Sequence, residues 1–255
     1  MSKANSPLSA EAQKKRFLSA EWRDLAMLNF AIDPQCLQPM APKGTLVDTF
    51  DGQAYVSLVG FLFGQTKVMG IPLLFHQQFE EVNLRFYVRR MCGEEARRGV
   101  VFIKEIVPAF LISRSARFFY NESYITCPMR HRVETQGRQR RLEYLWRYNR
   151  KWNRIAVTGN GNARPPKTGS LEEFITHHEW GYTRQRDGRC LEYRVSHPRW
   201  DVATAAEFSL ECDGTALYGK EVGAALRKPP SSAFAIAGSA VSVYRGTCVD
   251  DRGQS

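Results

Sequence analysis

Apolar and polar residues alternate through much of the chain, and this period of two predicts β-strands. The clearest case is the segment from Phe79 to Val88. Successive side chains of a strand point to opposite faces, so one face carries Glu80 followed by four apolar side chains. The other face carries Glu81, Asn83, Arg85 and Tyr87, about 7 Å apart from one to the next. This second face is predicted to be either a solvated sheet face or the wall of a binding cavity.

The same reasoning predicts strands on both sides of the Asp51-Gly52 hairpin signal, between residues 45 and 61. The run 22–32 fits a strand or a helix equally well. Short helices are expected from Asp33-Pro34 to Met40 and from the capping box that begins at Ser170. Further strands are expected at 99–107, 111–120, 123–133, 140–148, 153–157, 180–186 and 190–196, with a final strand pair over 233–244.

Many strands with a few short helices predict a mostly β (α+β) protein, either an antiparallel barrel or a folded sheet. We expect a flexible arm at residues 1–18, one domain at 19–247 and a tail at 248–255. No stretch is long and apolar enough for a membrane span, and the N-terminus lacks the apolar core of a signal peptide. A cytoplasmic protein with no membrane partner is therefore expected.

The net charge of +10 is concentrated in one segment. Residues 130–154 hold nine Lys or Arg and two acids, an excess of +7, interleaved with aromatic residues as in single-strand nucleic-acid binders. However, Leu142, Tyr144 and Trp146 share one strand face, while Arg141, Glu143 and Arg147 share the other. This arrangement favours an amphipathic strand with a solvated polar face over a nucleic-acid site.

Metal and cofactor motifs are missing from the sequence. The six cysteines form no C-x-x-C pair, so zinc and dithiol sites lack support and reduced thiols are expected. His177, His178 and His197 have no metal-ligand spacing, and structural roles are favoured for them. No cofactor is predicted.

A second polar cluster lies between Arg114 and Tyr124, and it is either a polar turn or part of a site. Just before it, Lys104 and Glu105 stand within an apolar run and point to opposite faces, so at most one faces the interior. For Lys104 an exposed edge position is favoured over a buried nucleophile.

Several sequence segments together resemble one known family, and the resemblance covers about residues 17–245. The segments are 21–25, 51–56, 79–88, 98–102, 116–124, 170–174 and 192–198. The chain is similar to the YqjF-like family, domain of unknown function 2071, in the acetoacetate decarboxylase-like superfamily. The resemblance implies a cone-like β-barrel with short flanking helices that encloses a cavity. Authentic acetoacetate decarboxylases form a Schiff base on a lysine. The matching stretch here reads Asn121-Glu122-Ser123-Tyr124 and contains no lysine, so Schiff-base decarboxylation is disfavoured.

The leading hypothesis is a protein whose cavity binds a small organic ligand, either an acid or a carbonyl compound. The reaction, if the protein is an enzyme, is unassigned. Arg85 and Arg117 would hold the anion, and Asn83 and Asn121 would orient it. The acid–base candidates are Glu81, Tyr87, Glu122 and Tyr124. The alternative is a non-catalytic module that binds nucleic acid or an acidic partner through residues 130–154. The sequence leaves open whether the protein is an enzyme and whether it forms a homo-oligomer.

Overall fold

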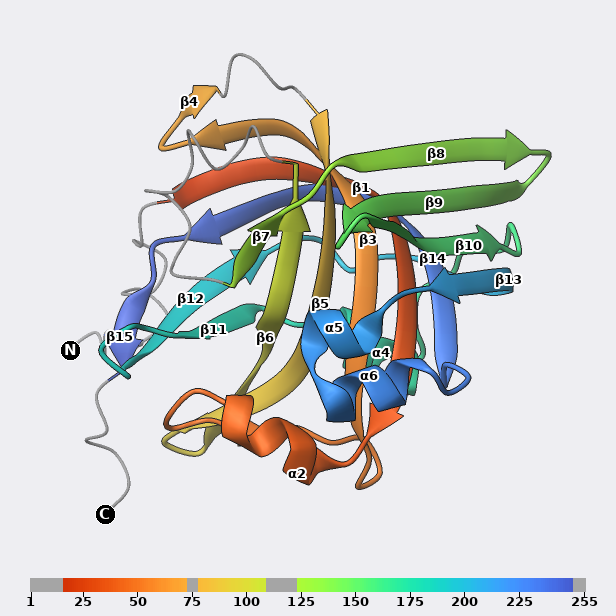
Figure 1. Ribbon diagram of the computed structural model, residues 1–255. Helices are drawn as coiled ribbons and strands as arrows, with labels where there is room; N and C mark the ends of the chain where they lie inside the picture. The colour runs from red at the N-terminus through yellow and green to blue at the C-terminus, as the bar shows by residue number, and fades with distance from the viewer. Residues whose placement is uncertain (1–15, 73–77, 109–122, 250–255) are drawn as a thin grey trace.

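Long strands that close into a ring form the centre of the molecule (Figure 1). The computed structural model describes residues 16–72, 78–108 and 123–249. Hydrogen-bonded neighbours follow the order β12-β11-β6-β5-β3-β1-β14, and β14 pairs again with β12, which closes a barrel. The β11–β6 pairing is parallel and the other pairings in this ring are antiparallel. The strands are β1 (Arg16–Ile32), β3 (Ala54–Val68), β5 (Gln78–Cys92), β6 (Glu95–Val107), β11 (Trp180–Arg184), β12 (Cys190–Ser196) and β14 (Ser232–Tyr244).

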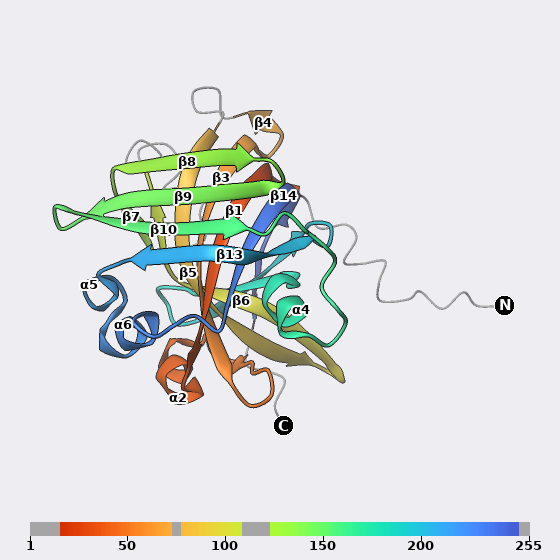
Figure 2. The ribbon, with the colours of Figure 1, turned by 90° about the vertical axis from the view of Figure 1, so that its right-hand side faces the viewer.

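A second layer crosses the outside of this barrel (Figure 2). It consists of β8 (Met129–Gln136), β9 (Gln139–Tyr148), β10 (Lys151–Gly159) and β13 (Val202–Glu211), and β13 connects the two layers by pairing with both β10 and β14. Apolar side chains of both layers form a core between them, including Leu58, Leu84 and Tyr144. Gly60 permits the close approach, because a Cβ there would lie 2.6 Å from Cδ2 of Tyr144.

Short helices and short strands complete the fold. The Asp33 side chain caps α2 (Pro34–Leu37) by accepting a hydrogen bond from the amide of Gln35 (2.8 Å), and the 3₁₀ helix η1 (Gln38–Met40) follows. The predicted Ser170 cap is present at α4 (Leu171–Thr176), where Ser170 Oγ accepts from the Glu173 amide (3.3 Å), but the Glu173 carboxylate accepts from the amide of Gly169 and not from that of Ser170. The remaining elements are α5 (Gly214–Tyr218), α6 (Lys220–Leu226), β2 (Leu46–Val47), β4 (Ile71–Pro72), β7 (Tyr124–Thr126) and β15 (Thr247–Val249).

The structure confirms the mostly β architecture and differs from the sequence prediction in detail. The run 22–32 is a strand, and 233–244 is one strand rather than a pair, so that prediction is wrong. The predicted strand 123–133 is divided into β7 and β8 at Cys127-Pro128, where proline cannot donate to a ladder. Strand β1 already begins at Arg16 and β15 ends at Val249, slightly outside the domain bounds of 19–247 that the sequence predicts. The predicted strand 111–120 lies outside the described residues.

The two faces of β5 differ in polarity, as the alternation of apolar and polar residues along this strand predicts. Val82, Leu84 and Phe86 belong to the core between the layers. Glu81, Asn83 and Arg85 face the barrel interior and are 3%, 3% and 8% exposed. This burial excludes a solvated sheet face for these residues. No helix within the described part of the chain is long and apolar enough to cross a membrane.

Candidate functional site

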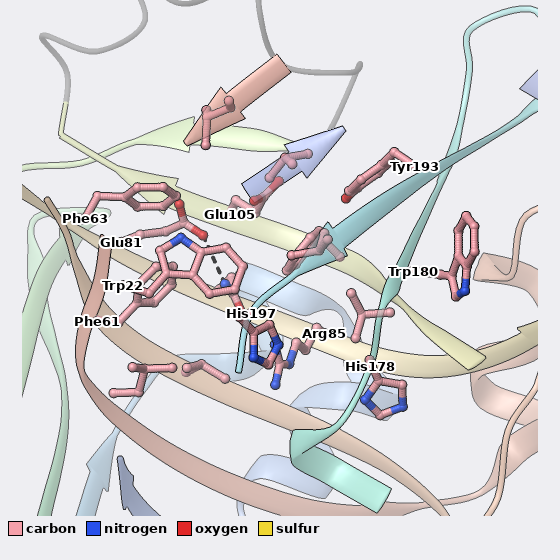
Figure 3. A pocket seen from close by; sticks show the side chains of 18 of the residues that line it. Trp22, Phe61, Phe63, Glu81, Arg85, Glu105, His178, Trp180, Tyr193 and His197 are labelled. Carbon is pink, nitrogen blue, oxygen red and sulfur yellow. Dashed lines mark hydrogen bonds between the residues drawn. The ribbon is translucent and has the colours of Figure 1, made fainter. Parts of the chain in front are cut away.

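The barrel interior contains a cavity of about 100 Å³ whose walls are largely aromatic (Figure 3). By volume it accommodates a few water molecules or one small organic molecule. Strands β1, β3, β5, β6 and β12 all contribute to its wall. Its lining residues are Phe17, Leu18, Trp22, Leu25, Val59, Phe61, Phe63, Glu81, Asn83, Arg85, Val100, Phe102, Glu105, Tyr124, Thr176, His178, Trp180, Tyr193, Val195, His197, Trp200 and Val243.

Two carboxyl groups meet in this cavity. Glu105 on β6 lies directly opposite Asn83 on β5, and hydrogen bonding to Glu105 is among the influences that lower the pKa of Glu81. Because an ionised carboxylate oxygen only accepts, a hydrogen bond between the two carboxyl groups needs one shared proton. Asn83 Nδ2 donates to Glu81 Oε1 (3.0 Å), and the Tyr124 hydroxyl donates to Glu105 Oε1 (3.0 Å).

Burial controls the protonation of this carboxyl pair. Removal from water raises the pKa of Glu81 to about 7, against the lowering effects of its hydrogen bonds and of the Arg85 charge. A carboxyl group with a pKa near neutrality both donates and accepts a proton at neutral pH. The pair therefore has the properties of a general acid–base group.

Arg85 places a positive charge on the same strand face. Its side chain points into the cavity next to His197, as Figure 3 shows. Its Nε is buried and has no hydrogen-bond partner among the described residues, nor does the guanidinium form an ion pair with any of them. Burial of a charge without a partner is costly. This arrangement is suited to a bound anion.

Two histidines that the sequence analysis assigned to structural roles also line the cavity. Burial and the nearby arginines hold the pKa of His178 well below its usual value, so its ring is neutral. His197 Nδ1 contacts the carbonyl oxygen of Pro198 at 2.8 Å. A carbonyl only accepts, so Nδ1 carries the proton and Nε2 of the neutral ring is an acceptor.

A sequence signal for His197 exists. Tyr193, Val195 and His197 are two residues apart, and all three line the cavity, so alternation along β12 places them on one face. His178 and Trp180 show the same spacing just before and within β11.

The predicted site residues do not all meet. Glu81, Asn83, Arg85 and Tyr124 line the cavity, together with Glu105, which was not among the candidates. Tyr87 is not among the lining residues that the structure describes, because its side chain lies behind His178 with ring centroids 4.7 Å apart. The candidates Arg117, Asn121 and Glu122 lie outside the described residues.

Hydrogen bonds fix the orientation of Tyr87. Its hydroxyl oxygen lies 2.5 Å from Ser57 Oγ, and Ser57 donates to Asn29 Oδ1 (2.6 Å). Because the Ser57 proton is used there, Tyr87 is the donor to Ser57. All three residues are buried, so Tyr87 supports the cavity floor from behind.

Lys104 is half-buried on the face of β6 opposite to Glu105, and β6 is an interior strand of the barrel, so the expected exposed edge position is wrong. The Lys104 Nζ donates to the carbonyl oxygen of Leu217 (2.5 Å) and lies 6.0 Å from the centre of the Tyr218 ring. No lysine is among the described residues that line the cavity.

The basic segment 130–154 forms β8, β9 and the start of β10. The predicted amphipathic strand is present, with Leu142, Tyr144 and Trp146 buried. Many of its charges are paired: Arg132 with Glu134, Arg140 with Asp24, Arg141 with Glu143, and Arg154 with Glu143 and Glu211. Trp152 is 40% exposed and is covered in part by Arg130, 4.9 Å from its ring centre.

Comparison with solved structures defines the class of fold. The chain is similar to acetoacetate decarboxylase from Legionella pneumophila (TM-score 0.63, 12% identity, 99% of this chain and 98% of that chain). It is also similar to the enduracididine biosynthesis enzyme MppR complexed with pyruvate (TM-score 0.61, 14% identity, 98% and 97%). These matches show an acetoacetate decarboxylase-like fold.

Residues 19–240 match the model of family DUF2071, described as an uncharacterized conserved protein, and the chain belongs to this family. It is also 26% identical over 197 residues to the uncharacterized protein YqjF of Bacillus subtilis (strain 168). That alignment covers 74% of this chain and 76% of YqjF.

Proposed function

We propose that this protein binds a small organic acid inside its barrel and that Arg85 holds the carboxylate. The observation that carries this proposal is a buried guanidinium with no ion-pair partner among the described residues, in a cavity walled by aromatic rings. Arginine binds a carboxylate through two parallel hydrogen bonds, and a dry surrounding strengthens them. The similar enzyme MppR has been solved in complex with pyruvate, a small acid of this kind.

The carboxyl pair gives the site a proton-transfer function. Glu81 stands four residues from Arg85 on the same strand face, so a ligand held at Arg85 extends toward the pair. With a pKa raised to about 7, Glu81 exchanges protons with a carbonyl or hydroxyl oxygen of the ligand at neutral pH. The chemistry we propose is thus general acid–base chemistry on a bound acid.

Schiff-base chemistry is not part of this proposal. It requires an amine at the ligand, and Lys104 points away from the cavity toward Leu217 and Tyr218.

A thermal-shift screen with a panel of small acids (pyruvate, acetoacetate, benzoate) tests the proposal. A ligand that binds only the folded state raises the melting temperature with its concentration. We expect such a rise for the unmodified protein, no rise for Arg85→Met, and an unchanged rise for the control Arg147→Met at an exposed position of β9. An equal rise in Arg85→Met would show that the acid does not bind at Arg85.

A further inference from the structure

Resting on the proposed function, we infer that the acid bound at Arg85 is a planar aromatic carboxylate with a hydroxyl group at the far side of its ring. Three features of the cavity support this ligand class. They are a Trp22 indole without a stacked partner, the spacing of residues along β5, and an unsatisfied acceptor on Asn83.

The indole of Trp22 has no parallel partner among the described rings. Phe61, Phe63, His197 and Trp200 approach it with centroids 5.5–6.3 Å away, at interplanar angles of 47–81°. By contrast, Phe63 stacks on Phe79 at 10°, and His197 stacks on Trp200 at 13°. Trp22 lines the cavity and none of these rings stacks on it, so a flat ligand in the cavity can supply the parallel partner.

The position of Trp22 depends on a distortion of β1. The register shifts between Arg23 and Ala26, and Asp24 adopts a positive φ of 59°. This irregularity lets Trp22 and Leu25, which are three residues apart, both line the cavity. The adjacent β14 accommodates it with Gly238, where a Cβ would overlap the carbonyl oxygen of Trp22.

The spacing of residues along β5 is on the scale of a substituted ring. The Cα atoms of Arg85 and Asn83 are about 7 Å apart, and a benzene ring with substituents at opposite ends has a similar length. Asn83 donates to Glu81, but its Oδ1 is buried without a partner among the described residues. A ligand hydroxyl would donate to this oxygen, next to the Glu81–Glu105 pair. The cavity volume of about 100 Å³ admits one such ring.

Isothermal titration calorimetry with 4-hydroxybenzoate, its saturated analogue 4-hydroxycyclohexanecarboxylate, and pyruvate tests this inference. One stacked ring is worth about 0.5–1.5 kcal/mol, so we expect 4-hydroxybenzoate to bind up to about tenfold tighter than the saturated acid. Trp22→Leu should remove this preference and Trp22→Phe should keep it. The control Trp152→Leu, on the outer layer, should also keep it.

Equal affinities for the flat and the saturated acid would overturn the inference, as would a preference that persists in Trp22→Leu. If pyruvate still bound in an Arg85-dependent manner, the proposed function would stand. If none of the three acids bound, the proposed function would fail as well. Circular dichroism of each variant verifies folding, and the comparison of the flat with the saturated acid in the unmodified protein provides the test if Trp22→Leu does not fold.

Discussion

Arg85 is a charged residue whose burial is not offset by an ion pair with any residue that the structure describes. We therefore predict that Arg85→Met increases the free energy of unfolding of the ligand-free protein by about 1 kcal/mol, because an apolar side chain of similar length removes the cost of desolvation. Urea unfolding of both proteins measures this difference. A loss of several kcal/mol would instead assign Arg85 to a structural ion pair.

Glu81 links stability to pH. The folded protein raises its pKa from 4.5 to about 7, so in this range the folded state holds a proton that the unfolded chain releases. The free energy of unfolding should fall as pH rises through this window, by on the order of 3 kcal/mol. Glu81→Gln has no such proton and should be the more stable protein at the upper end of the window.

Urea unfolding at about pH 5 and about pH 7.5 measures this difference, and Glu95→Gln at an exposed position of β6 is the control. A gap between Glu81→Gln and the unmodified protein that does not widen with pH would show that burial does not raise this pKa.

Lys104 is placed where it cannot act on a ligand in the cavity. We predict that incubation with acetoacetate followed by borohydride reduction leaves the mass of the peptide that contains Lys104 unchanged. Mass spectrometry of the digested protein measures this. An adduct at Lys104 would reinstate Schiff-base chemistry.

At the scale of elements, alternation along single strands was predictable and pairing between strands was not. The sequence placed Glu81, Asn83 and Arg85 on one face of β5, and the structure shows that face buried. It could not reveal that Glu105 meets Glu81, because the register of β5 against β6 shifts between Leu84 and Arg85. The same limit applies to His197 directly after β12: alternation groups it with Tyr193 and Val195, but only the β12–β14 pairing shows that this face lines the cavity.

The segment 197–232 contains three elements, β13, α5 and α6, that the sequence pattern did not predict. Strand β13 is rich in alanine, and much of it is exposed, so it has no clear alternation. Helices α5 and α6 are short, and only the Asp213 side chain, which accepts from the amide of Ala216 (3.2 Å), marks a start.

The irregularity in β1 should depend on Gly238. A side chain there would overlap the carbonyl oxygen of Trp22 and would have to adopt φ +88°. We predict that Gly238→Ala lowers the free energy of unfolding by about 2–4 kcal/mol and weakens ligand binding. Gly188→Ala is the matched control, since it has φ +81° in open space and should cost only about 1 kcal/mol. Equal losses in the two variants would show that the contact with Trp22 is unimportant.

At the scale of the whole molecule, the cavity exists because the barrel closes. Strand β3 pairs with both β1 and β5 and so brings Trp22 and Arg85 together, whereas His197, directly after β12, reaches Trp22 through the β14–β12 pairing. The family resemblance implied this closure, and the solved structures bear out the fold. Strand patterns alone left a barrel and a folded sheet as alternatives.

The net charge of +10 is also a property of the whole molecule. Because Arg132, Arg140, Arg141 and Arg154 are paired with carboxylates, we predict that the protein does not bind single-stranded DNA at physiological salt. Fluorescence anisotropy of a labelled oligonucleotide during a salt titration measures this. Tight binding that Arg130→Ala or Arg147→Ala weakens would favour the alternative function.

The most direct test of the account is a crystal structure of the protein with the acid that stabilises it most in the thermal-shift panel. We predict that the carboxylate of this acid lies within hydrogen-bond distance of the Arg85 guanidinium inside the barrel, with the rest of the molecule directed toward Glu81 and Glu105. An acid bound outside the barrel, or an Arg85 side chain paired with a carboxylate of the protein itself, would contradict the account.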